Sequence, residues 1–281
     1  MNSPFIAAIV VNWNGRDLTL RLLRSLREIN YENFYVIVVD NGSSDGSGDA
    51  FRSAFPDIEI IELDMNYGYS EGINKGIKRA EELNADFYWV FNNDVVVKRD
   101  TLSKLLEAMN SDPKIGIAGP IVRDFSTGKV AHAGYRINMW FGWMKEIGMP
   151  LSYTPYEVDS AFGCSNLIRS DVVKDMGMFD RDYNVYFDET DFNTRARRKG
   201  WKVVVVPGAE VLHEESATMN KRLIRKAWLL LRNLLLFEIK NAKDYQLLFF
   251  LFYYFIVHLP YFFLRGSLET IRIFLKTRCG E

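Results

Sequence analysis

The chain has 281 residues, and its 35 basic and 36 acidic side chains almost cancel to a formal net charge of −1. This balance excludes the broad basic surface that nucleic-acid-binding proteins normally present, so we expect no nucleic-acid partner. The length suits one large domain, or one domain with an appendage. Cys164 and Cys279 lie too far apart in sequence for a metal-binding pair, and such sparse cysteine use fits a reducing, cytoplasmic compartment.

Short apolar strands alternate with amphipathic helices through the first half of the chain. The strands are expected at Phe5–Val11, Tyr35–Asp40, Ile58–Leu63 and Phe87–Phe91. Helical spacing fills the intervals at Leu18–Ile29, Asp49–Phe55 and Glu71–Leu83, and returns at Thr101–Met109. This order predicts an α/β fold with a mostly parallel, Rossmann-like sheet and right-handed crossovers. Because no basic leader precedes the first apolar stretch, we interpret it as a strand and not as a signal peptide.

The fourth predicted strand runs directly into Asn92, Asn93 and Asp94. Open α/β sheets bind their ligands at the carboxyl ends of the strands, which is where these side chains are expected. Amide and carboxylate oxygens there suit Mg²⁺ or Mn²⁺. The same residues are ordinary turn formers, so this stretch by itself leaves both interpretations open.

Polar, glycine-rich loops follow the other three strands. They are Asn12–Gly15, Asp40–Ser47 and Asn66–Gly76. Turn chemistry explains each loop separately, but three such loops on one sheet edge beside Asp94 favour an anion-binding crevice. The dinucleotide pattern G-x-G-x-x-G does not follow the first strand, and the P-loop pattern G-x-x-x-x-G-K-[ST] is absent from the sequence. The sequence therefore disfavours dinucleotide redox chemistry and P-loop phosphoryl transfer.

The motifs VVDNGSSDGS, NYGYSEGINKG and FNNDVVV, in this order and spacing, resemble the family 2 glycosyltransferases of GT-A fold. The resemblance is strongest to the rhamnosyltransferase-like members. It implies an inverting enzyme that uses a nucleotide-diphosphate sugar, with Asp40 facing the nucleobase and Lys75 near the pyrophosphate. Asn12, Asn66 and Asn93, from the same loops, complete the expected donor-binding set.

The resemblance also implies a divalent metal site. Asn92 and Asp94 occupy the positions of the family metal motif, and His213 matches the histidine of a V-x-H pattern, which makes it a third ligand for Mg²⁺ or Mn²⁺. A bound cation neutralises the charge that develops on a departing nucleoside diphosphate. Asn92 supplies a neutral oxygen where many members have a carboxylate. His132 matches no motif and is a candidate to line the donor or acceptor pocket.

The segment Tyr186–Phe192, followed by Arg195, resembles the acidic pair, spacer, further aspartate and arginine of the family. An inverting transfer needs one carboxylate to take the proton of the acceptor hydroxyl. The family position of this base is Glu189, and Asp188 is the alternative. Asp191 and Arg195 are four residues apart and are expected to form an exposed structural pair. Without the resemblance, the acids fit equally well as ordinary residues of a helix first turn.

The composition changes beyond residue 220. Lys221–Lys240 has a helical pattern, and Tyr245–Leu264 carries neither acidic nor strongly basic side chains, a length that in principle spans a bilayer. Dense aromatic residues and basic flanks favour peripheral contact of residues 221–278 with the inner face of the cell membrane. A homodimer interface and a true span remain the alternatives.

We therefore predict one GT-A domain followed by a helical appendage at residues 221–281. Residues 1–118 would bind the nucleotide sugar, and residues 119–220 would bind the acceptor and carry the base. The predicted reaction moves a sugar from dTDP-rhamnose or a UDP-sugar to a hydroxyl of a saccharide or lipid-linked saccharide. The alternative is a non-catalytic nucleotide-sugar or glycan-binding module at a membrane surface, which the residues at positions 92 and 189 would permit. A nucleotidyltransferase is disfavoured because the sequence has no early glycine- and lysine-rich loop.

Overall fold

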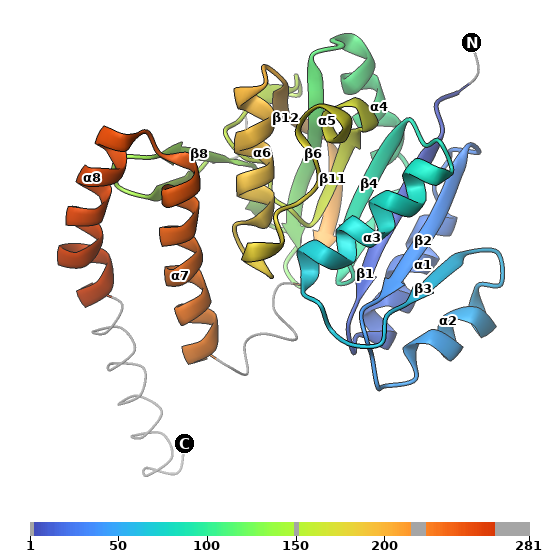
Figure 1. Cartoon of the computed structure of the whole chain (residues 1–281). Helices are drawn as coiled ribbons and strands as arrows, with labels where there is room; N and C mark the ends of the chain where they lie inside the picture. Colours follow the sequence, from blue (N-terminus) through green and yellow to red (C-terminus); the bar gives the residue numbers. More distant parts are fainter. Residues whose placement is uncertain (1–2, 149–151, 215–222, 262–281) are drawn as a thin grey trace. The chain divides into compact units, whose positions relative to one another are not determined.

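The computed structural model describes residues 3–148, 152–214 and 223–261 (Figure 1). The chain divides into two compact units. The first comprises Met1–Arg136 with Lys145–Ala217, and the second comprises Ile137–Met144 with Thr218–Glu281. We name them the sheet unit and the helical unit.

Parallel strands form the first half of the sheet unit. They are β1 (Ile6–Asn12), β2 (Phe34–Asp40), β3 (Glu59–Glu62) and β4 (Phe87–Asn92), in the spatial order β3-β2-β1-β4. The connecting helices are α1 (Arg16–Arg27), α2 (Ser47–Ala54) and α3 (Tyr69–Glu82). The alternation predicted from the sequence is confirmed, and the carboxyl ends of β1 and β2 lie in register, with Asn12 opposite Asp40.

The second half of the sheet mixes strand directions. β11 (Ser165–Arg169) lies antiparallel between β4 and β6 (Ile115–Asp124), and β12 (Lys202–His213) runs parallel to β6. The short strands are β5 (Val95–Val97) and β10 (Tyr156–Glu157), which pair with β12, and β7 (Val130–His132), which pairs with β6. The helices of this half are α4 (Thr101–Ser111), α5 (Ser170–Met176), the 3₁₀ turn η1 (Arg181–Tyr183) and α6 (Asp188–Arg198).

Both faces of the sheet are covered by helices (Figure 1). Successive residues of β1 point to opposite faces, as the period of a strand requires. Ile6, Ala8 and Val10 belong to a buried cluster with residues of α1, α2 and α4. Ala7 and Ile9 belong to a second cluster with residues of α3, α5 and α6. Because both faces of β1 are buried, its sequence is a continuous apolar run and does not alternate with polar residues.

Two glycines at the end of the third polar loop, Gly72 and Gly76, lie in α3, within the helix predicted at Glu71–Leu83. A Cβ on Gly76 would stand 2.2 Å from Cγ2 of Ile9, and a Cβ on Gly72 would stand 2.7 Å from Cγ1 of Val11. These glycines therefore allow α3 to pack closely on β1.

The helical unit contains α7 (Leu223–Asn241), α8 (Asp244–Tyr253) and a π-helical turn, Tyr254–His258. The hairpin of β8 (Tyr135–Asn138) and β9 (Trp143–Glu146) contributes its tip to this unit. There, Nε2 of His258 donates a hydrogen bond to the Phe141 carbonyl oxygen at 2.7 Å. Gly142 makes room for the Phe250 ring, because a Cβ on it would stand 2.6 Å from Cε2 of Phe250.

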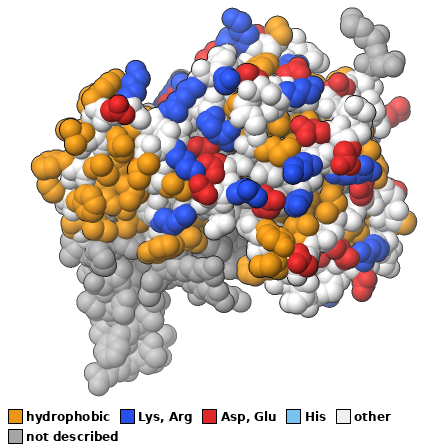
Figure 2. Space-filling view, viewed as in Figure 1, with side chains coloured by type: hydrophobic (Ala, Val, Ile, Leu, Met, Phe, Trp, Pro, Cys, Tyr) orange, Lys and Arg blue, Asp and Glu red, His pale blue; other side chains and the backbone are white. Residues whose placement is uncertain are grey.

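Apolar side chains gather over α8 on the visible face of the molecule (Figure 2). The large exposed ones on this helix and the following turn are Tyr245, Leu248, Phe249, Phe252, Phe255 and Ile256. None of the described helices combines the length and apolar character needed to cross a bilayer. The end of the predicted apolar run, after Tyr261, lies outside the described residues.

Candidate active site

Three of the predicted donor-binding residues form one hydrogen-bond network at the ends of β1, β2 and β4. Asn12 is fully buried and donates from Nδ2 to Oδ1 of Asp40 at 3.0 Å. Its own Oδ1 accepts from the hydroxyl of Thr19 at 2.8 Å and from Nδ2 of Asn93 at 3.2 Å. The Ser43 hydroxyl also donates to Oδ1 of Asp40. The Asp40 carboxylate is thus held in a fixed orientation at the sheet edge, which suits recognition of a nucleobase.

Asn66 joins a neighbouring network around Asn41. Asn41 donates from Nδ2 to the Gly68 carbonyl at 2.9 Å and to Oδ1 of Asn66 at 3.3 Å, and its Oδ1 accepts from the Tyr67 amide at 3.0 Å. Gly42 has a φ of +72°, and a Cβ there would stand 2.5 Å from the Met65 carbonyl carbon. The loops after β2 and β3 are therefore locked together.

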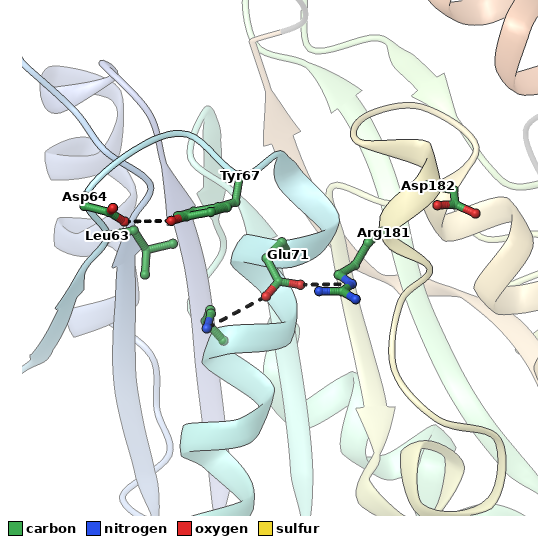
Figure 3. Close-up of a pocket in the computed structure, with 7 residues that line it drawn as sticks. Leu63, Asp64, Tyr67, Glu71, Arg181 and Asp182 are labelled. Atoms are coloured by element: carbon green, nitrogen blue, oxygen red, sulfur yellow. Dashed lines mark hydrogen bonds and ion pairs between the residues drawn. The ribbon is translucent and has the colours of Figure 1, made fainter.

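Lys75 lies in a different place, in a pocket of about 520 Å³ beside α3 (Figure 3). Its Nζ is 3.8 Å from Oε1 of Glu71, whose other oxygen is 3.7 Å from Nε of Arg181. Tyr67 closes one side by donating to Asp64 at 2.9 Å. The structure thus groups Lys75 with Glu71 and Arg181 and not with the Asn12–Asp40 network.

Strand pairing brings Asp94 and His213 together. β5 pairs antiparallel with β12, with Val95 opposite His213, and the amide of Glu214 donates to the Asp94 carbonyl at 3.0 Å. As a result, Oδ1 of Asp94 lies 3.0 Å from Nε2 of His213, a side chain that is only 6 % exposed. Both atoms are buried, and neither has a hydrogen-bond partner within the described chain.

This donor set fits Mg²⁺ or Mn²⁺. Two buried, convergent ligand atoms without a hydrogen bond are an arrangement that a cation would satisfy. No cluster of three or more His, Cys, Asp or Glu that could hold a metal occurs among the described residues, so phosphate, water or amide oxygens would complete the shell. Asn92 ends β4 close by in sequence, and its amide donates to the Cys164 carbonyl at 3.0 Å.

The two acidic residues predicted as base candidates begin α6. The preceding Tyr186 and Phe187 have φ values of 67° and 66°, a left-handed conformation that non-glycine residues rarely adopt. This turn directs the pair inward, so that Asp188 is only 3 % exposed. Glu189 lies against Gly163, where a Cβ would stand 2.8 Å from Cγ of Glu189.

Burial changes the protonation of this pair. It raises the pKa of Asp188 well above its ordinary value, and the neighbouring Glu189 charge raises it further. Burial also raises the pKa of Glu189, whereas hydrogen bonds from the backbone and from Asp188 favour its charged form. Burial thus favours a proton on the pair, and the hydrogen bonds to Glu189 favour its charged form. Burial likewise raises the pKa of the Cys164 thiol, which stays neutral beside Asp94 and Glu189.

A protein-family model, "Glycosyl transferase family 2", matches residues 7–177. The chain belongs to this family. The expected resemblance to rhamnosyltransferases is confirmed by two relatives. An N-acetylglucosaminyl-diphospho-decaprenol L-rhamnosyltransferase of Mycobacterium tuberculosis is 27% identical over 77% of this chain and 78% of its own. The dTDP-rhamnosyl transferase RfbF of Shigella flexneri is 25% identical over 76% and 70%.

Solved structures agree on the GT-A fold of this glycosyltransferase. Mannosyltransferase PcManGT from Pyrobaculum calidifontis, in complex with GDP-Man and Mn²⁺, superposes with a TM-score of 0.65 at 20% identity, over 86% of this chain and 66% of that one. GalNAc-T7 with UDP, GalNAc and Mn²⁺ gives 0.65 at 13% identity, over 75% and 44%. At these identities the likeness concerns the fold only.

The ion pair of Asp191 and Arg195 stabilises α6, the helix that begins with the two base candidates. Arg195 donates from Nε to Oδ2 of Asp191 at 2.7 Å, and it also donates to the carbonyl oxygens of Met176 and Met178. Asp191 is 1% exposed and accepts from the Tyr183 hydroxyl at 3.3 Å. The expectation of an exposed pair is wrong, because η1 covers the aspartate.

Sequence reasoning missed the segment Phe162–Cys164, which lies between the metal and base candidates. The Phe162 ring contacts His213 edge-on, with centroids 5.6 Å apart, and Gly163 makes room for Glu189. A glycine followed by a cysteine is a weak local signal, and it does not indicate that Phe162–Cys164 contacts both candidate pairs. Tyr69 was also missed, and its buried hydroxyl has no partner in the part of the chain described.

Proposed function

We propose that this glycosyltransferase is an inverting, metal-dependent hexosyltransferase that acts on a saccharide carried by a lipid. The observation that carries this proposal is the convergence of two buried pairs on the segment Phe162–Cys164. Phe162 contacts His213 of the Asp94–His213 pair, and Gly163 contacts Glu189 of the Asp188–Glu189 pair. A leaving-group clamp and a base are the two functions that such a transfer needs.

Each residue has a defined part in the proposed reaction. Glu189 accepts the proton of the acceptor hydroxyl while that oxygen forms a bond to C1 of the sugar. The bond from C1 to the phosphate oxygen breaks, and its electron pair leaves with the nucleoside diphosphate. Attack from the face opposite the leaving group inverts the anomeric configuration. Asp94 and His213, with Asn92, would hold Mg²⁺ or Mn²⁺, which when bound neutralises the charge on the diphosphate.

Asp188 supports Glu189 without competing with it. Since burial keeps its proton in place, it donates a hydrogen bond to the Glu189 carboxylate. The Asn12–Asp40–Asn93 network would hold the nucleoside, with Asn66 on the neighbouring loop. Lys75 lies in the separate pocket beside α3, with Glu71 and Arg181, and has no assigned contact to the nucleoside.

The activities for which the relatives are named guide the choice of substrates. Both relatives are named as rhamnosyltransferases. The name of the Shigella flexneri relative specifies dTDP-rhamnose as the donor, and the name of the Mycobacterium tuberculosis relative specifies a diphospho-decaprenol acceptor. We therefore place dTDP-rhamnose first among donors, followed by UDP-sugars. The exposed apolar side chains of α8 and the adjacent Lys243 support peripheral contact with the inner face of the cell membrane, where a lipid-linked acceptor is located.

The test is a transfer assay with dTDP-rhamnose, UDP-hexoses and GDP-mannose, each with Mg²⁺, Mn²⁺ or a chelator. We expect cation-dependent transfer from one nucleotide family and a product anomer opposite to that of the donor. Thermal unfolding of the same mixtures should show stabilisation by that nucleotide with cation. Stabilisation without transfer to any acceptor or to water would support the non-catalytic module instead. Retention of configuration, or full activity in the chelator, would contradict the mechanism.

A further inference from the structure

A second histidine lies one aromatic ring away from the metal candidate. His132 ends β7, and its ring stacks on Phe162 with centroids 3.9 Å apart and planes at 10°. The same Phe162 contacts the His213 ring. His132 therefore borders the segment on which the two catalytic pairs converge, although no motif in the sequence marks it.

Two partners fix the orientation and protonation of this ring. Nδ1 of His132 lies 2.5 Å from Oε1 of Glu146 and 2.9 Å from the Tyr135 hydroxyl. A carboxylate can only accept hydrogen bonds, so Nδ1 carries the proton. In the neutral ring, Nε2 then presents its lone pair. Glu146 thus sets the tautomer of His132, as the partners of metal-binding and catalytic histidines do.

Nε2 of His132 is buried and has no hydrogen-bond partner in residues 3–148, 152–214 and 223–261. Leaving a buried acceptor unsatisfied costs about 1–3 kcal/mol. A histidine that served only packing would satisfy both nitrogens or be replaceable by an apolar ring. In His132, Nδ1 lies within hydrogen-bond distance of two partners, whereas Nε2 is buried without a partner in the described residues.

We propose that His132 is a substrate-binding residue whose Nε2 accepts a hydrogen bond from a hydroxyl of a pyranose. Glu146 and Tyr135 hold its tautomer, and Phe162 holds its plane. The inference rests on the proposed function, because the hydroxyl belongs either to the transferred hexose or to the acceptor saccharide. Since Nε2 has almost no exposed surface here, sugar binding must change the surroundings of this atom, which gives a direct readout.

The first experiment is nitrogen NMR of the imidazole rings in the full chain, with His132→Gln used to assign the signal. The matched control is His258→Gln, because His258 lies in the helical unit and its Nε2 is 2.7 Å from the Phe141 carbonyl. We expect Nε2 of His132 to be the unprotonated nitrogen. Its signal should move with dTDP-rhamnose or a UDP-hexose plus Mg²⁺, but not with the nucleoside diphosphate, if it binds the donor sugar. If His132 binds the acceptor, its Nε2 signal should move only when N-acetylglucosaminyl-diphospho-prenol is added.

Steady-state kinetics of the variants are the second experiment. His132→Ala should lower kcat/KM of transfer about 10- to 100-fold, as expected for loss of one hydrogen bond to a sugar hydroxyl. The affinity of His132→Ala for the nucleoside diphosphate and its thermal midpoint should stay near the wild-type values. Glu146→Gln should lower kcat/KM less than His132→Ala does. A donor role lowers affinity for the nucleotide sugar, whereas an acceptor role raises the acceptor KM and leaves donor hydrolysis unchanged.

The two failures are distinguishable. If wild-type protein transfers sugar and His132→Ala transfers within about twofold of it, the inference is rejected and the proposed function stands. If wild-type protein transfers nothing, the proposed function fails, while the NMR signal still decides the role of His132. A signal unmoved by donor and acceptor rejects that role in either case.

Discussion

At the scale of single residues, we propose different roles for the neighbouring acids Asp188 and Glu189 because their surroundings differ. Asp188 is buried and Glu189 is half-buried. Burial is the main cause that raises the pKa of Asp188, and the neighbouring Glu189 carboxylate raises it further. The family resemblance ranked Glu189 before Asp188 as the base, but the residues themselves gave no physical reason for that order. The difference in surroundings comes from the helix start and from Gly163, which only the fold brings together.

Replacing these acids one at a time tests the assignment. Glu189→Gln removes the proton acceptor and should reduce kcat about 100-fold or more. Asp188→Asn replaces an already neutral group of similar shape and should stay within about 10-fold of wild type. Because burial raises the pKa of Glu189, the carboxylate is lost on acidification earlier than an ordinary glutamate, so the acid limb of the wild-type kcat profile should lie at higher pH. Equal losses in both variants would contradict the division of roles.

Gly163 offers a test that leaves the acid in place. In Gly163→Ala the new Cβ would meet Cγ of Glu189 at 2.8 Å, so the base must shift. We expect transfer to fall about 10-fold or more, since small displacements of a catalytic group are costly. The matched control is Gly148→Ala, where a Cβ meets nothing within 4 Å. Binding of nucleoside diphosphate, measured by calorimetry, should be unchanged in both, and equal activity in the two variants would refute the close contact.

At the scale of elements, β5 shows what sequence can and cannot predict. The sequence predicts the strand-helix alternation, because apolar runs and helical spacing are local. It identifies Asp94 and His213 only through a family resemblance, since the pairing of Val95 with His213 joins distant segments after an irregular register in β12. The burial of Asp191 under η1 and the open Nε2 of His132 depend on tertiary packing and have no local signal.

The helix α7 contains a buried acid that the reaction does not use. Glu238 is 0% exposed, and both of its carboxyl oxygens are without a hydrogen-bond partner in the described chain. Burial raises its pKa to about 8. Between the ordinary glutamate pKa and this value, the folded state binds a proton that the unfolded state has lost. Stability should therefore fall as pH rises through this window.

Denaturant unfolding of the full chain at pH 6 and pH 8 tests this expectation. Wild-type protein should lose up to about 1.4 kcal/mol of unfolding free energy per pH unit in this range. Glu238→Gln should remove that slope and be more stable than wild type at pH 8. The control is Glu107→Gln, an exposed glutamate on α4. An identical slope in wild type and Glu238→Gln would show that Glu238 ionises freely.

At the scale of the whole molecule, the proposed catalytic residues and the proposed membrane-binding surface lie in different units. Every residue proposed for the donor, the metal or the base lies in the sheet unit, whereas the helical unit exposes Leu248, Phe252 and Phe255 on α8 and the turn after it. The chain passes between the units at residues 136–137, 144–145 and 217–218. A surface that binds lipid would thus be covalently tied to the half of the domain that we expect to bind the acceptor.

Vesicle sedimentation decides whether that surface binds lipid. The double variant Leu248→Glu with Phe252→Glu removes two exposed apolar side chains, each worth about 1.5–3 kcal/mol when buried, and should weaken binding to anionic vesicles at least 10-fold. Tyr153→Glu, which changes an 88% exposed aromatic in the sheet unit, should bind like wild type. Binding of nucleoside diphosphate should not change in either variant, because the donor residues lie in the sheet unit. A different outcome is that wild-type protein does not bind vesicles but sediments as a dimer, and that the double variant sediments as a monomer. In that case the α8 surface is a contact between two copies of the chain.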